Sequence, residues 1–332
     1  MADPHPSVAA VRVAVRSAVE RTSPDALVLA AVSGGADSLA LMAALAFEAP
    51  RRGRRVAVVH VDHGLQRGSA EQARQVVDQA HGLGVPDARV CRVYVDVARG
   101  GRGPEGSARA ARYAALDAEA ERSGAEQVHL GHTLDDQAEQ VLLGLARGAG
   151  ARSLAGMPPE RGRYVRPLLG LTRELLVEAC RQQGLAPWAD PSNVDPAYTR
   201  NRVRHRVLPV LEAELGPGIA AALARTAELL RDDADLLDDL AADGWAACSA
   251  ASPDGADEGL SVAALLALPP ALRGRVLRTA ALGAGAPASD LTLGHVRAVE
   301  ALVLDWRGQG PIPLPGGLVA VRRCDRLVVE AP

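Results

Sequence analysis

The chain has 332 residues, of which 48% are hydrophobic and eight are aromatic, and its formal net charge is −3. This length exceeds what one compact domain usually needs and suffices for two. Its four cysteines (Cys91, Cys180, Cys248 and Cys324) form no C-x-x-C pair, and no run of 18 apolar residues occurs. The sequence therefore indicates neither a disulfide framework, a cysteine zinc site nor a membrane span. We expect a cytoplasmic protein without a membrane partner.

Charge is unevenly distributed along the chain. Every one of the 37 basic residues is an arginine. Residues 147–206 contain 11 arginines against five acidic residues, whereas residues 225–258 contain two arginines against ten acidic residues. The basic stretch is where a polyanion such as nucleic acid would bind, although a solvated surface explains the same charges equally well.

The first half of the chain predicts four strand–helix units after an amphipathic N-terminal helix. The predicted strands are 26–32, 56–61, 88–95 and 127–131, and the predicted helices are 38–48, 69–83, 105–123 and 134–147. This alternation indicates an α/β fold with a doubly wound parallel sheet, whose ligands bind at the carboxyl ends of the strands. We assign residues 1–216 to this domain.

The most informative segment, Ser33-Gly34-Gly35-Ala36-Asp37-Ser38, joins the first strand to its helix. Unpaired backbone N–H groups and the helix dipole favour an anion at such a turn. Glycines let a phosphate approach the backbone, and the two serines supply hydroxyl donors. A carboxylate at Asp37 would repel that phosphate unless a divalent cation lay between them. The segment thus predicts a nucleotide with Mg²⁺, the alternative being a simple tight turn. It is not a Walker P-loop, because it lacks the lysine-containing pattern.

Further polar residues follow the other strands. His60, Asp62 and His63 end the second strand, where they are either metal ligands or strand caps, and their role stays open. On the third helix, Arg109 and Arg112 are three residues apart and share a face suited to phosphates.

The helix after the fourth strand begins with acidic residues. Asp136 and Glu139 share one face that would point toward Asp37, which suggests a site for Mg²⁺ or for an amine substrate. The alternative is that Asp135 and Asp136 simply complement the helix dipole. Downstream, Trp188 and Tyr198 lie near three alternating arginines, as single-stranded nucleic-acid sites require, although a tryptophan is more often a core residue.

After Gly216-Pro217-Gly218 we expect a second, smaller, mostly helical accessory domain at residues 217–332. An acidic helix over 219–245 precedes a linker at 252–259 and helices at 262–268, 271–282 and 290–304. A hairpin of strands 318–322 and 326–330 follows Leu314-Pro315-Gly316-Gly317. This region shows no catalytic motif, and the role of its acidic helix stays open.

Seven segments together resemble the tRNA(Ile)-lysidine synthases, a family of the PP-loop ATP pyrophosphatase group. They are SGGADS (33–38), HVDHGLQR (60–67), EGSARAARY (105–113), LGHTLDDQAEQ (130–140), RGAGARSLAGM (147–157), RPLL (166–169) and DPSNVDPAYTRNRVR (190–204). They occur in the family's order and are distributed over about the first two thirds of the chain. Gln66, Ala149 and Ser153 depart from the usual pattern without touching a catalytic position.

The resemblance implies a PP-loop, adenine nucleotide alpha hydrolase-like fold and an ATP-dependent ligation of L-lysine. The acceptor is C2 of the wobble cytidine in the CAU anticodon of tRNA(Ile), and the products are lysidine, AMP and diphosphate. O2 of cytidine first attacks the α-phosphate, and the lysine amine then displaces AMP. The modified anticodon reads AUA rather than AUG.

The same resemblance assigns roles to residues. Ser33, Gly34, Gly35, Ala36, Asp37 and Ser38 would bind ATP, with Mg²⁺ on Asp37 and Asp136. The catalytic residues would be Asp37, Arg112, Asp136 and Glu139, whereas Arg147, Arg152, Arg200, Arg202 and Arg204 would bind tRNA. The accessory domain would recognise the tRNA body. A homodimer is compatible with the sequence, and the acceptor of the lysine proton stays open among His132, Asp136, Glu139 and water.

Two other functions compete with this interpretation. A sulfur-transferring tRNA enzyme shares the loop, but it would need paired or exposed reactive cysteines. A non-catalytic nucleotide sensor on the same fold would bind ATP without turnover, and it would not need the basic stretch at 147–206.

Overall fold

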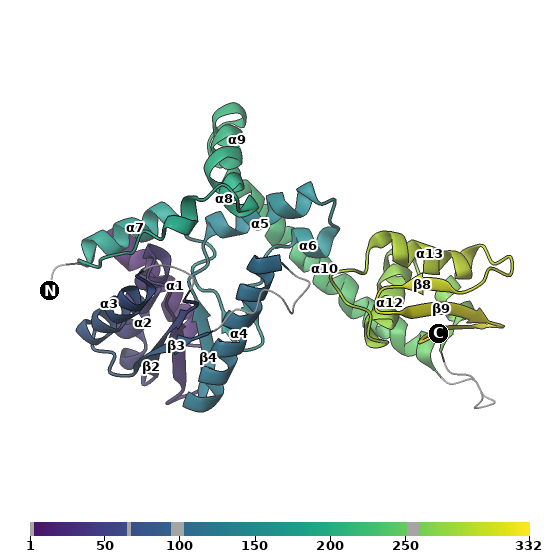
Figure 1. The fold of residues 1–332 in the computed structure, drawn as a ribbon, viewed down its shortest axis with the longest axis horizontal. Helices are drawn as coiled ribbons and strands as arrows, with labels where there is room; N and C mark the ends of the chain where they lie inside the picture. The colour runs from purple at the N-terminus through teal and green to yellow at the C-terminus, as the bar shows by residue number, and fades with distance from the viewer. Residues whose placement is uncertain (1–2, 65–67, 94–102, 251–258) are drawn as a thin grey trace. The chain divides into compact units, whose positions relative to one another are not determined.

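The computed structural model describes residues 3–64, 68–93, 103–250 and 259–332, shown in Figure 1. The chain divides into two compact units, Met1–Arg231 and Asp232–Pro332, and the division falls inside the long helix α10 (Ile219–Ser249). The sequence placed the domain boundary at 216/217, where the chain does turn after α9 (Leu208–Leu215). The first part of α10 belongs to the first unit because Arg231 donates hydrogen bonds to the backbone carbonyls of Ala155 and Met157.

The first unit is built on a six-stranded sheet in the order β3-β2-β1-β4-β6-β5. The strands β1 to β4 and β6 are parallel, and β5 pairs antiparallel with β6 at the edge. The strand bounds are β1 Leu27–Ala31, β2 Arg55–Asp62, β3 Ala88–Arg92, β4 Ala125–Leu130, β5 Glu160–Arg161 and β6 Tyr164–Val165. All four predicted strands are confirmed. The β5–β6 hairpin was not predicted, because strands of two residues carry no periodic pattern. The last two predicted residues of the third strand, Tyr94 and Val95, lie outside the described residues.

Helices cover both faces of this sheet, as the doubly wound prediction requires (Figure 1). Successive side chains of a strand point to opposite faces, so Val28 and Ala30 of β1 pack on one side and Leu27 and Leu29 on the other. The first side is covered by α1 (Pro6–Val19), α2 (Ala36–Glu48), α3 (Ser69–Gly82) and α7 (Arg173–Gln182). The second side is covered by α4 (Gly103–Ser123).

The chain order of the strands reverses at β1. The chain runs outward from β1 through β2 to β3 and then returns to place β4 on the other side of β1. Such a reversal opens a crevice at the carboxyl ends of the two central strands, where ligands of α/β sheets bind. The loop Ser33–Gly35 and the loop Gly131–Thr133 leave β1 and β4 at this point. A Cβ at Gly131 would lie 3.1 Å from the backbone of Asp37 and Ser38, so the loop after β4 packs directly against the first turn of α2.

The remaining helical segments of the first unit lie on both sides of α4 in the sequence. The 3₁₀ turn η1 (Pro50–Arg52) joins α2 to β2. After α4 come α5 (Leu134–Ala146), α6 (Ala151–Leu154), the 3₁₀ turn η2 (Pro191–Val194), α8 (Thr199–Arg202) and the π-helical turn η3 (Val203–Val207). Among the described residues, no single helix is long and apolar enough to cross a membrane. Thr199–Leu215 and Ile219–Ser249 meet that test only when joined across a 99° bend.

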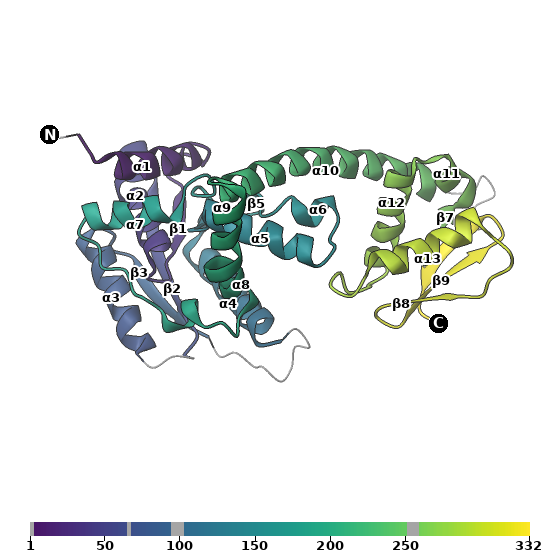
Figure 2. The same cartoon turned by 90° about the horizontal axis from the view of Figure 1, so that it is seen from above.

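The second unit has its own core around a four-stranded antiparallel sheet in the order β7-β10-β9-β8 (Figure 2). Its elements are β7 Leu260–Ser261, α11 Val262–Ala267, α12 Pro270–Gly283, α13 Leu293–Leu304, β8 Ile312–Leu314, β9 Leu318–Arg323 and β10 Arg326–Glu330. The three predicted helices and the hairpin are confirmed. The short strands β7 and β8 widen that hairpin into a sheet, so this unit is less purely helical than predicted. Residues 252–258 of the predicted linker lie outside the described residues.

We expect Gly131→Ala to lower the free energy of unfolding by about 1–3 kcal/mol, the usual cost of overpacking. The added methyl group would press on the backbone at the start of α2, which cannot move aside as a flexible side chain would. Gly170→Ala is the matched control, because a Cβ there meets nothing within 4 Å. Urea unfolding of both variants tests the contact, and equal stability of the two would contradict it.

Candidate active site

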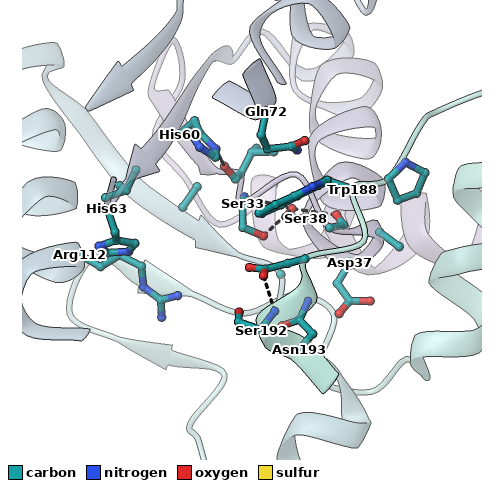
Figure 3. Close-up of a pocket in the computed structure, with 18 of the residues that line it drawn as sticks. Ser33, Asp37, Ser38, His60, His63, Gln72, Arg112, Trp188, Ser192 and Asn193 are labelled. Carbon is teal, nitrogen blue, oxygen red and sulfur yellow. Dashed lines mark hydrogen bonds between the residues drawn. The ribbon is translucent and has the colours of Figure 1, made fainter. Parts of the chain in front are cut away.

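The carboxyl ends of β1, β2 and β4 open into a cavity of about 960 Å³ (Figure 3). Its walls come from the loops after these strands, from α4, and from the segment between Pro187 and His205. The volume lies at the upper end of the usual range for ligand pockets. It is therefore large enough for a nucleotide together with a second substrate.

The predicted phosphate loop forms one side of this cavity. Ser33, Gly35, Ala36, Asp37 and Ser38 line it. The Ser38 hydroxyl accepts hydrogen bonds from the backbone N–H groups of Ser33 and Gly34, both at 3.2 Å, and donates to the Gly35 carbonyl at 2.9 Å. Ser38 is buried, so it braces the loop.

Gly34 cannot be replaced without strain. Its φ of +93° is a conformation that favours glycine, and a Cβ there would lie 1.9 Å from Nε2 of Gln72. The loop is thus held in shape at the N-terminus of α2, where an anion is stabilised.

Asp37 points into the cavity (Figure 3) with only one of its oxygens paired. Its Oδ2 accepts from Nε of Arg173 at 3.2 Å, whereas its buried Oδ1 has no hydrogen-bond partner in the described part of the chain. Burial raises the pKa of Asp37 to about 6, an effect that Arg173 partly offsets and Asp136 reinforces. The unpaired oxygen is therefore available to a cation.

Asp136 is saturated with donors. Its Oδ2 accepts from the backbone N–H and the hydroxyl of Thr133, at 2.9 and 3.1 Å, in a capping box at the start of α5. Its Oδ1 accepts from three guanidinium groups, those of Arg173 at 3.2 Å, Arg200 at 3.1 Å and Arg204 at 3.2 Å. Burial by itself would raise the pKa of Asp136, but Arg200 and Arg173 hold it below its ordinary value.

Glu139 is completely buried and does not line the cavity. Its Oε1 accepts from Nε of Arg204 at 2.6 Å, and its Oε2 accepts from Arg200 at 2.6 Å and from Arg204 at 3.0 Å. Three carboxylates (Asp37, Asp136, Glu139) and three guanidinium groups (Arg173, Arg200, Arg204) thus form one charge-balanced group, which we call the carboxylate–arginine cluster.

The cluster changes how several predicted residues must be understood. Asp37 and Asp136 converge as predicted, because both bind Arg173. Asp136 and Glu139, however, are occupied by arginines where the sequence predicted an open site for a metal or an amine. Arg200 and Arg204, predicted to contact tRNA, bind these carboxylates and also line the cavity, and their contact with tRNA stays a prediction. Arg173 was not predicted from the sequence, although buried carboxylates require nearby cations.

Arg112 lies on the wall formed by α4, near His63 (Figure 3). Its side chain is half-buried, and its buried Nε has no hydrogen-bond partner within the described ranges. Burial, together with the neighbouring Arg109, lowers the pKa of Arg112. None of the described ion pairs joins this guanidinium to a carboxylate, so it is suited to bind an anionic ligand.

His60 and Asp62 have partners that cap the strand end. Nδ1 of His60 lies 2.8 Å from the carbonyl oxygen of Val32, and Oδ1 of Asp62 accepts from the Gly64 N–H at 2.8 Å. No group of three or more metal-binding side chains occurs among the described residues. These contacts favour the strand-cap interpretation. His63, beyond the strand, faces the cavity.

The segment with Trp188 closes the cavity opposite the sheet (Figure 3). The backbone N–H of Trp188 donates a hydrogen bond to the carbonyl oxygen of Gly34 at 2.9 Å. This bond joins the segment directly to the phosphate loop. The amide of Asn201 donates to the carbonyls of Ser192 and Asp195, at 2.7 and 2.9 Å, and fixes η2. Trp188 therefore lines the site and is not part of the core.

The other predicted tRNA contacts lie away from the cavity. Arg147 is exposed at the end of α5, where it donates to the Leu143 carbonyl, and Arg152 is exposed on α6. Arg202 donates to the carbonyls of Pro196 and Ala197. Contacts of these three arginines with tRNA stay a prediction.

Both units match known families. Residues 10–211 match the PP-loop domain, and residues 260–328 match the TilS substrate binding domain. The chain is 52% identical to the tRNA(Ile)-lysidine synthase of Thermobifida fusca over 100% of both chains. It is 52% identical to that of Streptomyces coelicolor over 98% of this chain and 99% of the relative. The chain belongs to the tRNA(Ile)-lysidine synthase family. Salinispora arenicola has a further member, 54% identical over 98% of this chain and 97% of the relative.

A solved structure shares the fold of the first unit at low sequence identity. The U34-tRNA thiolase NcsA from Methanococcus maripaludis, determined with its [4Fe-4S] cluster, superposes with a TM-score of 0.57 at 18% identity, over 68% of this chain and 80% of that one. In this chain Cys180 is buried and donates to the Ala36 carbonyl, and burial raises its pKa to about 12.

We expect Glu139→Gln to lower the free energy of unfolding by roughly 3 kcal/mol, the cost of leaving buried charges unpaired. The amide would remove the charge that balances Arg200 and Arg204. Glu178→Gln is the control, because its ion pair with Arg181 is exposed to solvent, where such pairs contribute little to stability. Urea unfolding measures both, and a Glu139 variant as stable as the control would contradict the buried cluster.

The raised pKa of Asp37 gives a second stability prediction. The folded chain favours the neutral carboxyl, so ionisation of Asp37 costs stability as the pH rises through about 6. Without divalent cations, Asp37→Asn should therefore be more stable than the natural chain at pH 7.5, by up to roughly 3 kcal/mol. The advantage should disappear near pH 4. A variant that is less stable at pH 7.5 would show that Asp37 is not strained by its burial.

Proposed function

We propose that this chain ligates L-lysine to C2 of the wobble cytidine in the CAU anticodon of tRNA(Ile), converting ATP to AMP and diphosphate. The observation that carries the proposal is the single cavity at the ends of β1 and β4. It joins the phosphate loop, the carboxylate–arginine cluster and Arg112, whose Nε has no hydrogen-bond partner among the described residues. The names of relatives that match the whole chain support the same reaction.

The cavity has walls of opposite character, which suits the first step. The N–H groups of the braced loop at Ser33–Ser38 would bind the polyphosphate of ATP at the start of α2. Arg112, on the opposite wall, would stabilise the charge that develops when O2 of cytidine attacks the α-phosphate. The bond formed is O2–phosphorus, and the bond broken releases diphosphate.

The residues fit Mg²⁺ at one position. Oδ1 of Asp37 is buried and unpaired within the described chain, and carboxylate oxygens are the ligands that Mg²⁺ prefers. Asp136, the second predicted ligand, would have to lose an arginine first. A bound Mg²⁺ would neutralise charge on the diphosphate leaving group.

Lysine must lose a proton before its amine attacks C2 of the adenylated cytidine, because its ordinary pKa is about 10.4. Of the four candidate acceptors, Glu139 does not reach the cavity, and arginines hold the pKa of Asp136 low. His132 lines the cavity, and burial lowers its pKa to about 3, so its ring is neutral. Its Nδ1 has no partner among the described residues. A ring whose pKa is held this low binds a proton weakly, so of the four candidates we favour water as the acceptor.

The second unit would recognise the tRNA body, in keeping with its match to the TilS substrate binding domain. Methionine tRNAs also carry a CAU anticodon, so the anticodon alone cannot define the substrate. Arg147, Arg152 and Arg202 remain candidates for phosphate contacts, which would make binding weaken with added salt. A tRNA substrate places the reaction in the cytoplasm. A homodimer stays a prediction that light scattering can check.

We expect labelled lysine to be incorporated into tRNA(Ile) with a CAU anticodon, in the presence of Mg·ATP, as a product that survives base-catalysed deacylation. Methionine tRNA should stay unlabelled. Replacing all four cysteines by serine should leave incorporation intact, which excludes sulfur-transfer chemistry. ATP binding without AMP release under these conditions would identify a nucleotide sensor and overturn the proposal.

We expect Arg112→Met to slow AMP release by about 10²–10³-fold, as removal of one group that stabilises a transition-state charge typically does. Arg122→Met is the matched control from the same helix, because Arg122 is exposed, pairs with Glu119 and does not line the cavity. Rapid-quench measurement of the adenylation step compares them. Equal losses of rate in the two variants would show that AMP release depends on the total positive charge of the helix and not on Arg112 itself.

A further inference from the structure

The guanidinium of Arg173 bridges two different carboxylates. Its Nε donates to Oδ2 of Asp37 and its Nη2 donates to Oδ1 of Asp136, each at 3.2 Å. An arginine that serves one ion pair usually directs both arms of its fork to one carboxylate. Here the fork spans two residues, so a positive charge lies between the two carboxylates that converge on the cavity.

Arg173 differs from the other two arginines of the cluster. Arg200 and Arg204 also bind the buried Glu139, which ties them into the protein interior. All three arginines line the cavity, with side chains 27%, 25% and 20% exposed for Arg173, Arg200 and Arg204, but among the described ion pairs Arg173 alone of the three does not bind Glu139. Its carboxylate partner Asp37 still has a buried oxygen without a hydrogen bond among the described residues. Arg173 can therefore leave toward the cavity without opening the core.

The backbone of Arg173 is anchored independently of its side chain. Its N–H donates to Oδ2 of Asp135 at 2.8 Å, and the N–H of Leu134 donates to the Leu171 carbonyl at 2.9 Å. These bonds join the N-termini of α7 and α5. The guanidinium can thus move away while its tether holds it within reach of both carboxylates.

We propose that Arg173 occupies the place of the divalent cation between Asp37 and Asp136 in the ligand-free chain and leaves it when the metal binds with ATP. The inference rests on the proposed function for the identity of the nucleotide. Arg173 keeps two like charges from repelling each other while the site is empty. It also competes with a free metal ion, so that the cation binds well only when it arrives with phosphate. Arg173 is a positioning residue in this role.

The test measures Mn²⁺ binding to the full chain by electron paramagnetic resonance, without ATP, lysine or tRNA. Arg173→Gln should bind Mn²⁺ about tenfold or more tightly than the natural chain, because a competing unit charge is removed. Arg173→Lys, which keeps the charge, should bind like the natural chain. Arg181→Gln is the control on the same helix, because Glu178 is the only carboxylate that Arg181 pairs with in the described part of the chain.

Combining Arg173→Gln with Asp37→Asn should abolish the gain in Mn²⁺ affinity. This double variant distinguishes binding at Asp37 from weak Mn²⁺ binding by other acidic residues. No gain in Arg173→Gln, or a gain that survives loss of Asp37, would overturn the proposal. Because the assay contains no lysine or tRNA, failure of lysine ligation would leave its outcome unaffected.

A second measurement covers the case in which Arg173→Gln does not fold. The Nε–H signal of Arg173, assigned in the natural chain through Arg173→Lys, should shift when Mg²⁺ and a non-hydrolysable ATP analogue are added together. An unchanged signal under saturating ligand would show that Arg173 keeps its hydrogen bond to Asp37, and it would overturn the displacement.

Discussion

The site depends on burying three carboxylates close together. Asp37, Asp136 and Glu139 repel one another, and an unpaired charge in a protein interior costs several kcal/mol. Three arginines balance them, two from the α8–η3 segment and one from the start of α7. This requirement brings segments far apart in the sequence to the same end of the sheet, and it fixes the floor of the cavity.

The same cluster links the site to the rest of the first unit. Arg200 and Arg204 hold the α8–η3 segment against α5, and Asn201, between them, holds η2 over the cavity. Trp188, upstream of η2, binds the phosphate loop through its backbone. The wall opposite the sheet is thus positioned by ion pairs whose arginines line the cavity and whose innermost carboxylate, Glu139, does not.

Two charged side chains of the cavity, Arg112 and Asp37, lack a complete set of partners among the described residues. Arg112 has no carboxylate partner among the described ion pairs, whereas Asp37 retains an unpaired oxygen. An anion and a cation can therefore bind side by side, as a magnesium nucleotide does. A site in which every charge was already paired would offer neither. Arg112 and Asp37 are incompletely paired and can bind ligands. Glu139 is completely paired with arginines and supports the fold of the site.

The sequence by itself determined the α/β alternation, the phosphate loop and the convergence of Asp37 with Asp136, because these follow from local periodicity and from the rule that parallel strands end at one edge. It could not determine that Arg200 and Arg204 point inward, that Arg173 joins the site or that Glu139 is closed to ligands. A charge in a sequence is equally compatible with solvent and with a buried partner. Only the tertiary structure decides between them, because the partner comes from a distant segment and the cost of burial depends on what surrounds it.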